Sequence, residues 1–266
     1  MTRTEELRAL ARRVADGLPP LAGDVVLTGS TSRGVADELS DVELLALAEE
    51  LPPLEQCVAY DGLDRVETWI PPHGQVYWTG GYAGDEYVEV LWWPRAFLEE
   101  RLRGILAAEI VEHERLRTAE AIANGIALRG DGLKRWHAQL ADYPEPLAAA
   151  IVDTAAETWH DPPRSERAFL RAGDTFVLTK RLVEEAENVM RIVFALNRTW
   201  EPGWKRVSLV LERLEQKPDR IVERLDDALR ALDLRAMQAL VADTLALAPA
   251  TPAVLKAREQ VAAFLA

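Results

Sequence analysis

The chain has 266 residues, enough for one large domain or two smaller ones with a sizeable hydrophobic core. Its apolar fraction of 48% argues against a disordered chain. Its formal net charge of −13 argues against a surface that tracks nucleic-acid phosphates. The same charge either favours a cationic substrate or simply keeps the protein in solution.

The sequence also limits the compartment and the metal chemistry. Cys57 is the only cysteine, which excludes an internal disulfide and is consistent with a reducing compartment. Residues 1–6 lack the apolar stretch of a signal peptide, and no apolar run approaches membrane-spanning length. The four histidines lack the paired spacing of zinc ligands. We expect a cytoplasmic protein with no membrane partner, and the sequence leaves its oligomeric state open.

Hydrophobic periodicity predicts a mixed region of helices and strands, followed by helices alone. Thr2 and Glu5 have the spacing of a capping box, and a first helix extends to residue 17. Prolines and glycines, including Gly80 and Gly81, punctuate the strand-like segments and suggest hairpins near a sheet edge. Strands are expected at residues 25–28, 41–47, 57–60, 65–70, 75–79, 86–92 and 126–128. The main helices after residue 100 are expected at residues 107–124, 133–140, 147–159 and 164–196, with further helices to residue 266.

This order of elements predicts an α+β chain with two domains. Residues 1–132 are expected to form a mixed sheet flanked by helices. Residues 133–266 are expected to form an all-helical bundle. The boundary is placed after the last strand and its glycine-containing turn.

A Gly-Ser turn and two nearby carboxylates form the strongest motif of the chain. The apolar run of residues 25–28 ends at Gly29 and Ser30, and Asp41 and Glu43 follow in the next strand. Side chains alternate along a strand, so Asp41 and Glu43 point to the same face, with Cα atoms roughly 6.5–7 Å apart. Two carboxylates suit Mg²⁺, which is usually completed by water and substrate phosphate. Backbone N–H groups after the turn would attract phosphate.

Glu89 is the candidate third carboxylate. It lies between valines in the strand at residues 86–92 and shares a face with Tyr87 and Leu91. A carboxylate in an apolar strand is costly unless it is paired or binds a metal. The alternative is that this face of the strand is solvated. The aromatic residues Trp69, Tyr77 and Trp78 are interpreted as packing residues, since strands favour aromatic side chains.

Gly-Ser, a short spacer and then Asp-x-Glu between apolar residues resemble the signature of the DNA polymerase beta-like nucleotidyltransferase superfamily. Members usually add a third carboxylate from a later strand, and Glu89 fits that position. Many members carry Asp-x-Asp, so Glu43 departs from the pattern, and its longer side chain would shift a metal or weaken metal binding. The two-domain order is similar to that of aminoglycoside and lincosamide nucleotidyltransferases, in which the nucleotide lies between the domains.

The resemblance implies roles for several residues. Asp41 and Glu43 would hold Mg²⁺, and Ser30 with the backbone after Gly29 would hold the distal phosphates. Glu89 would either bind a second metal or take the proton from the attacking hydroxyl.

Three further residues have two interpretations each. Arg33 would hold a phosphate oxygen or lie in solvent on the short helix. Lys205, in the loop after residue 196, would contact the nucleotide or be an ordinary surface lysine. Asp174 would hold a cationic substrate or be an exposed helical aspartate.

The sequence therefore predicts a magnesium-dependent nucleotidyltransferase. It would move a nucleoside monophosphate, AMP from ATP or the equivalent from another nucleoside triphosphate, onto a hydroxyl of a small molecule and release pyrophosphate. An aminoglycoside-type antibiotic is the first acceptor class to consider, and no nucleic-acid partner is expected. The alternative is a catalytically silent nucleotide- or partner-binding protein on the same fold.

Overall fold

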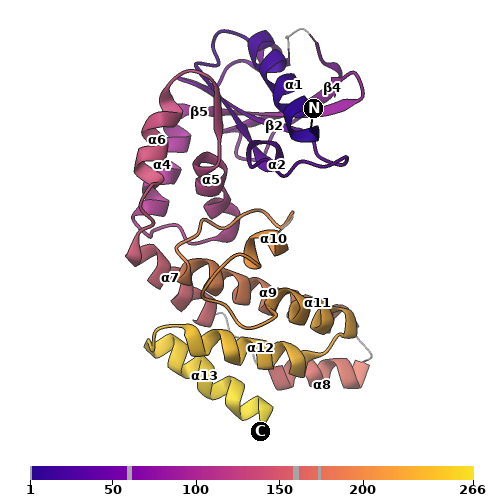
Figure 1. The fold of residues 1–266 in the computed structure, drawn as a ribbon, viewed down its shortest axis with the longest axis vertical. Helices are drawn as coiled ribbons and strands as arrows, with labels where there is room; N and C mark the ends of the chain where they lie inside the picture. The colour runs from indigo at the N-terminus through magenta and orange to yellow at the C-terminus, as the bar shows by residue number, and fades with distance from the viewer. Residues whose placement is uncertain (1, 59–61, 158–161, 173–174, 206) are drawn as a thin grey trace. The chain divides into compact units, whose positions relative to one another are not determined.

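The structure is a computed structural model that describes residues 2–58, 62–157, 162–172, 175–205 and 207–266 (Figure 1). The described strands form one mixed six-stranded sheet, and the described residues after the last strand are helical or loop. This confirms the predicted α+β class, with helices around an N-terminal sheet and a helical C-terminal region.

The strand order across the sheet is β3-β4-β5-β2-β1-β6. Strands β2 and β5 pair in parallel, and the other neighbours pair antiparallel. The strands are β1 (Asp24–Thr28), β2 (Val42–Ala48), β3 (Asp64–Trp69), β4 (Tyr77–Ala83), β5 (Glu86–Pro94) and β6 (Ile126–Arg129). The helices of the first half are α1 (Arg3–Gly17), α2 (Gly29–Ser32), α3 (Leu54–Val58), α4 (Arg95–Leu106), α5 (His113–Ala123) and α6 (Gly132–Leu140). The others are α7 (Glu145–Glu157), α8 (Pro162–Ala172), α9 (Thr175–Leu196), α10 (Val207–Leu211), α11 (Ile221–Ala231), α12 (Leu234–Leu247) and α13 (Pro252–Leu265).

The chain divides into two compact units. One comprises Met1–Gly104 and Thr118–Asp142, and the other comprises Ile105–Arg117 and Tyr143–Ala266. The first unit therefore continues past the predicted boundary at residue 132 and includes α6. The reason is a buried contact, because the Gly132 N–H donates a 2.8 Å hydrogen bond to Asp24 of β1.

The two faces of the sheet carry different side chains. Helix α1, which begins with the predicted capping box of Thr2 and Glu5, packs on one face. The strands contribute alternate residues to that face, and these are fully buried because the alternation of a strand turns every second side chain to the same side. They include Val25, Leu27, Val42, Leu44, Val88 and Val90. Residues of the other parity, such as Val26 and Glu43, point to the opposite face.

Several sequence expectations were wrong in detail. Residues 57 and 58 belong to helix α3 where a strand at 57–60 was expected, since a 2.9 Å hydrogen bond from the Gln56 N–H to the Pro53 carbonyl closes a turn here; residues 59 and 60 lie outside the described residues. Cys57 of α3 is fully buried, and burial raises the pKa of its thiol to about 12. Gly80 and Gly81 lie within β4 and do not end it.

One predicted helix also differs. The helix expected at 107–124 begins only at His113. Within the helix expected at 164–196, the described residues are helical as α8 and α9, and residues 173 and 174 lie outside the described residues.

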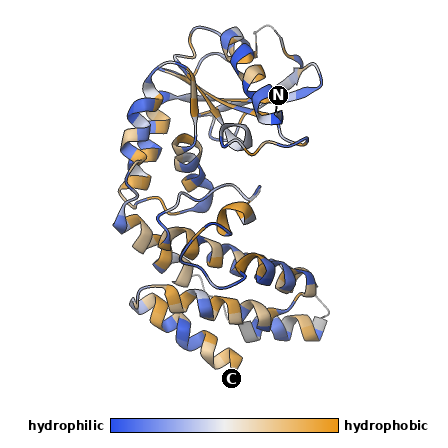
Figure 2. Cartoon of the chain, viewed as in Figure 1, coloured by the Kyte–Doolittle hydropathy of each residue, from blue (hydrophilic) through white to orange (hydrophobic). Residues whose placement is uncertain are grey.

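The second unit is built around helix α9. Helices α7, α8, α11 and α12 pack against α9, and α13 packs against α7 and α12. Figure 2 shows hydrophilic and hydrophobic residues interleaved along these helices, as expected of amphipathic helices with one buried stripe. Among the residues that the structure describes, no helix has both the length and the apolar character needed to cross a membrane.

Asp24 provides a test of the packing in the first unit. Its side chain is 2% exposed, and its Oδ2 lies 2.7 Å from Nη1 of Arg95. The same arginine pairs through Nε with Glu49, whose side chain is 83% exposed. We expect Asp24→Ala to lower the free energy of unfolding by about 2–4 kcal/mol, because Arg95 and the Gly132 N–H lose a buried partner. Glu49→Ala should cost less than about 1 kcal/mol.

Urea denaturation of the full chain measures both variants against the wild type. Equal losses in the two variants would contradict the assignment of the buried carboxylate as the main partner of Arg95.

Candidate active site

The candidate site begins at the sharp turn after β1. Gly29 has a φ of +70°, in the left-handed region that favours glycine, and it opens the single turn of helix α2. A Cβ at this position would lie 2.7 Å from Cδ and Oε2 of Glu43. The group that lies closest to the Cβ position of Gly29 is therefore the Glu43 carboxylate.

The sheet places Glu43 beside Glu89. The two residues are Cα partners in the parallel pairing of β2 with β5, so they lie on neighbouring strands about 4.8 Å apart. Thr28 is the Cα partner of Glu43 on β1, which puts the carboxylates next to the turn. Two carboxylates at such positions repel each other unless positive charge lies nearby. This juxtaposition links the two halves of the predicted motif.

Asp41 lies just before β2 and two residues from Glu43. Its backbone carbonyl accepts a 3.0 Å hydrogen bond from the Thr31 hydroxyl. The carbonyl of Glu43 accepts a 3.3 Å hydrogen bond from the Thr28 hydroxyl. Threonines of the turn thus hold the backbone that carries both carboxylates. All three predicted carboxylate side chains are partly exposed.

The turn itself is fixed from α1 and from within. Arg8 donates to the carbonyls of Thr31 and Ser32 at 3.0 and 2.6 Å. The Ser32 hydroxyl donates to the Gly29 carbonyl at 3.0 Å. Ser30 is 8% exposed. The first N–H groups of a helix have no partner within that helix, so this turn retains donors suited to phosphate. The phosphate role of Ser30 stays a prediction.

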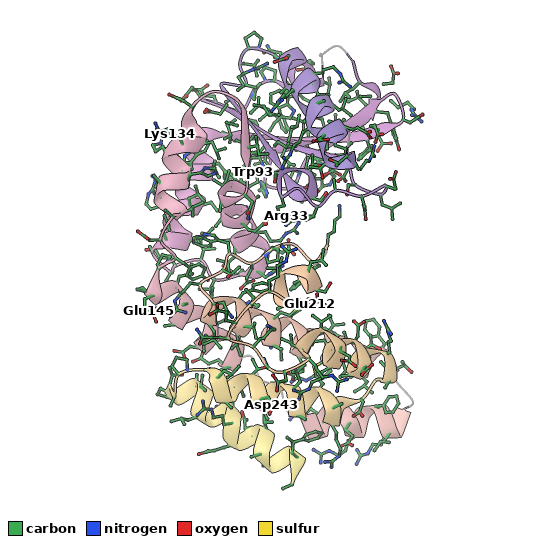
Figure 3. The ribbon with its side chains drawn as sticks, in the orientation of Figure 1. Arg33, Trp93, Lys134, Glu145, Glu212 and Asp243 are labelled. Atoms are coloured by element: carbon green, nitrogen blue, oxygen red, sulfur yellow. The ribbon has the colours of Figure 1, made fainter. Side chains whose placement is uncertain are left out.

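Arg33 forms an ion pair that the sequence did not reveal. Its Nη1 lies 2.8 Å from Oε1 of Glu120 in α5, and the two side chains are 17% and 9% exposed. The alternative that Arg33 lies in solvent is therefore wrong, because its side chain, labelled in Figure 3, is partly buried and paired with Glu120. The guanidinium has five N–H donors, so this pair leaves a phosphate contact open, and that contact stays a prediction.

The donor chemistry of the site suits magnesium. Within the described residues, no group of three or more His, Cys, Asp or Glu side chains is arranged to hold a metal ion by itself. Mg²⁺ does not require such a cage, because it usually binds one or two carboxylates together with water and substrate phosphate. Asp41 and Glu43, beside a phosphate-suited turn, match that pattern, and Glu89 stands at the adjacent strand position.

Two predicted residues belong to other parts of the chain. Asp174 lies outside the described residues. Lys205 belongs to the second unit and is exposed, and its predicted nucleotide contact stays a prediction. The loop before it is anchored, since the Trp204 ring stacks on His113 at 3.9 Å between centroids. His113 also contacts the buried carboxylate of Glu201, with 2.7 Å between Nδ1 and Oε2.

Three residues on the Glu89 face of the sheet, Gly80, Tyr87 and Trp78, were not predicted as site residues. Gly80 of β4 is the Cα partner of Glu89. A Cβ on Gly80 would lie 2.3 Å from Oη of Tyr87 and 2.8 Å from the six-membered ring of Trp78. Burial, followed by the charges of Glu89 and Glu67, raises the pKa of Tyr87, so its phenol keeps its proton at neutral pH. The alternation of β5 already placed Tyr87 and Glu89 on one face.

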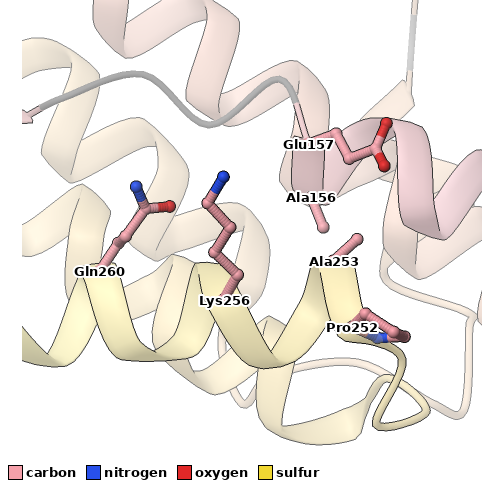
Figure 4. A pocket seen from close by; sticks show the side chains of 6 residues that line it. All are labelled: Ala156, Glu157, Pro252, Ala253, Lys256 and Gln260. Carbon is pink, nitrogen blue, oxygen red and sulfur yellow. The ribbon is translucent and has the colours of Figure 1, made fainter.

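A surface pocket lies elsewhere. It has a volume of about 450 Å³ and is lined in the second unit by α7 and α13 (Figure 4). Glu157, Lys256 and Gln260 are its polar residues, and none of the predicted site residues lines it.

One family model matches part of the chain. The family model described as a domain of unknown function (DUF4037) matches residues 110–206. That match includes Lys205 but neither the Gly29 turn nor the three carboxylates. No curated protein matches the chain.

One solved structure is similar over most of the chain. It is described as a nucleotidyltransferase-like protein from Exiguobacterium sibiricum 255-15 and has 14% sequence identity. The alignment covers 99% of this chain and 74% of that chain, with a TM-score of 0.38. At this level of similarity the match assigns neither an activity nor a substrate.

The contact between Gly29 and Glu43 generates a test with a matched control. Gly84 has a φ of +68°, but a Cβ added there would have no atom within 4 Å, whereas Gly29 faces the Glu43 carboxylate. We expect both Gly29→Ala and Gly84→Ala to cost about 1–2 kcal/mol of backbone strain. Only Gly29→Ala should also displace Glu43 and weaken magnesium-dependent ATP binding, by roughly tenfold or more, because the predicted metal ligand is moved.

Isothermal titration calorimetry with Mg²⁺ and ATP measures the binding, and thermal unfolding measures the strain. Equal ATP affinities in the two variants would show that the contact between Gly29 and Glu43 does not contribute to ATP binding.

Proposed function

We propose that the chain is a magnesium-dependent nucleotidyltransferase that transfers a nucleoside monophosphate, AMP from ATP in the first instance, onto a hydroxyl of a small molecule. The observation that carries the proposal is the position of Glu43, which is beside the Gly29 turn on one side and beside Glu89 on the other. A phosphate-suited turn next to adjoining carboxylates is the arrangement that binding a metal–triphosphate complex requires.

The reaction would be a displacement at the α-phosphorus. The acceptor oxygen forms a bond to the α-phosphorus, the bond between the α-phosphorus and the bridging oxygen breaks, and pyrophosphate leaves. Magnesium, held by Asp41 and Glu43 and completed by phosphate oxygens, would neutralise charge on the triphosphate. The chain would otherwise act by position, with the turn after Gly29 orienting the distal phosphates.

Glu89 has two roles compatible with its place. As the Cα partner of Glu43 it is close enough to the carboxylate pair to help bind a cation. It also lies on the side of Glu43 away from the turn, where a hydroxyl would approach and give up its proton. Both roles require it on this face, and they differ in what its loss would change.

The acceptor class follows from charge and chemistry. The chain carries a net charge of −13, and the face around the site adds carboxylates that attract a cation. A compound with both hydroxyl and ammonium groups, such as an aminoglycoside, is the acceptor class that this charge favours. The competing function is a silent nucleotide- or partner-binding protein, which the longer Glu43 side chain against Gly29 would suit.

Asp41→Asn is the first test of the proposed reaction. The substitution keeps the shape of the side chain but removes the charge that would hold magnesium. We expect pyrophosphate release from Mg²⁺ and ATP, measured across aminoglycosides, lincosamides and nucleosides, to fall by a factor on the order of 10² or more. Asp85→Asn, an exposed aspartate in the β4–β5 turn, is the matched control and should keep the wild-type rate.

Wild-type release that depends on one acceptor would establish the enzyme. Magnesium-dependent ATP binding with no release for any compound of the panel would instead support the silent binding protein. Equal rates in Asp41→Asn and the wild type would rule out the assigned metal site.

Glu89→Gln separates the two roles of Glu89. If Glu89 is the base, the catalytic rate should fall while the magnesium concentration that gives half-maximal activity stays near the wild-type value. If it is a ligand, that concentration should rise, because a charged oxygen donor is lost. Magnesium titrations of the initial rate at saturating ATP measure both quantities. A variant unchanged in both would place Glu89 outside the site.

A further inference from the structure

A single row of Cα partners crosses the sheet through the candidate site. Thr28 pairs with Glu43, Glu43 with Glu89, and Glu89 with Gly80. Gly80 in turn pairs with Glu67 on the edge strand β3. Because neighbouring strands are about 4.8 Å apart, the row extends about 14 Å from Glu43 to Glu67. Partners in such a row carry side chains on the same face of the sheet, so the row is continuous with the carboxylates.

The proposed reaction would place the leaving group and the acceptor at opposite ends of this row. In phosphoryl and nucleotidyl displacement, the attacking and leaving oxygens lie roughly in line on opposite sides of the phosphorus. The turn after Gly29 would hold the leaving pyrophosphate at the β1 end of the row. In this arrangement the acceptor would approach from the β5 and β4 end, over Glu89 and Gly80.

The surface at that end is shaped by the absence of a side chain. Gly80 is buried and carries no side chain, and the Tyr87 hydroxyl and the Trp78 ring lie over its backbone. Both side chains are only partly buried. Tyr87 does not extend into solvent, since its hydroxyl lies across β4, beside the strand position that pairs with Glu89.

We propose that Tyr87 is an acceptor-positioning residue of this enzyme. Gly80, which has no side chain, leaves room for the Tyr87 hydroxyl. The inference rests on the proposed function and deepens it. The phenol hydroxyl hydrogen-bonds a hydroxyl of the acceptor and holds it beside Glu89, and the Trp78 ring packs against the carbon face of the same acceptor. Glu67, at the far end of the row, provides a carboxylate for an ammonium group.

The chemistry of these groups defines the acceptor as a ring-shaped polyol that carries positive charge. A neutral phenol both donates and accepts hydrogen bonds, which suits a hydroxyl partner. An indole ring offers an apolar face to the C–H groups of a sugar-like ring and is attractive to a cation. A flat aromatic acceptor without hydroxyl groups would not use the Tyr87 oxygen.

Tyr87→Phe tests the inference against a close control, Tyr82→Phe. Tyr82 packs edge-on against Tyr87 with 5.1 Å between ring centroids, and both variants remove one phenol oxygen from the same hairpin. With Mg²⁺, ATP and the aminoglycoside that supports transfer, Tyr87→Phe should raise the KM of the acceptor roughly three- to tenfold, the value of one hydrogen bond. The KM of ATP should stay within about twofold of wild type, and Tyr82→Phe should change neither constant by more than about twofold.

Gly80→Ala provides a second, independent variant. An added Cβ at 2.3 Å from Oη forces the Tyr87 hydroxyl to move. Gly80→Ala should therefore raise the acceptor KM as Tyr87→Phe does. The double variant should be no worse than the more impaired single variant, because both changes remove the same contact.

The outcomes separate the inference from the proposed function. Wild-type transfer with equal acceptor constants in Tyr87→Phe and Tyr82→Phe would overturn the role of Tyr87 and leave the nucleotidyltransferase intact. A parallel rise of the KM values of ATP and acceptor would also overturn it, because it would show a structural effect. Absence of transfer to any compound of the panel by the wild type would overturn the proposed function, and this inference with it.

Discussion

The candidate site depends on the parallel pairing of β2 with β5. This pairing alone brings Glu43 and Glu89, which are distant in sequence, to neighbouring positions. The register is fixed from the opposite face, where Val42 and Val88 are partners and both are fully buried. A slip of one residue would turn those valines to the site and the glutamates into the core, so the hydrophobic face specifies the polar one.

The turn after β1 is matched to this pairing by two properties of one glycine. Gly29 adopts a left-handed backbone conformation, and its missing Cβ leaves room for the Glu43 carboxylate. Threonine hydroxyls and Arg8 then hold carbonyls of the turn and of the strand that follows it. The turn and the Glu43 carboxylate therefore pack directly against each other.

Local patterns predicted much of this arrangement, and long-range contacts account for what they missed. Alternation along β5 correctly put Glu89 and Tyr87 on one face, and the capping box of α1 was confirmed. The pairing of Arg33 with Glu120 was invisible, because the two residues are 87 positions apart and neither belongs to a motif. Gly80 was misinterpreted as a strand breaker, since only the register reveals that it faces Glu89. Cys57 was placed in the wrong element for a local reason, because strand preference outweighed the turn that begins at Pro53.

The strand pairings also divide the two substrates of the proposed reaction. The nucleotide side depends on β1 with β2, which join the Gly29 turn to Glu43. The acceptor side depends on β5 with β4, which join Glu89 to Gly80 and Tyr87. Strand β3 lies at the sheet edge, beyond both pairings, and its side chains are largely exposed. Sequence changes at this edge would alter the acceptor surface without disturbing the buried valines that set the carboxylate register.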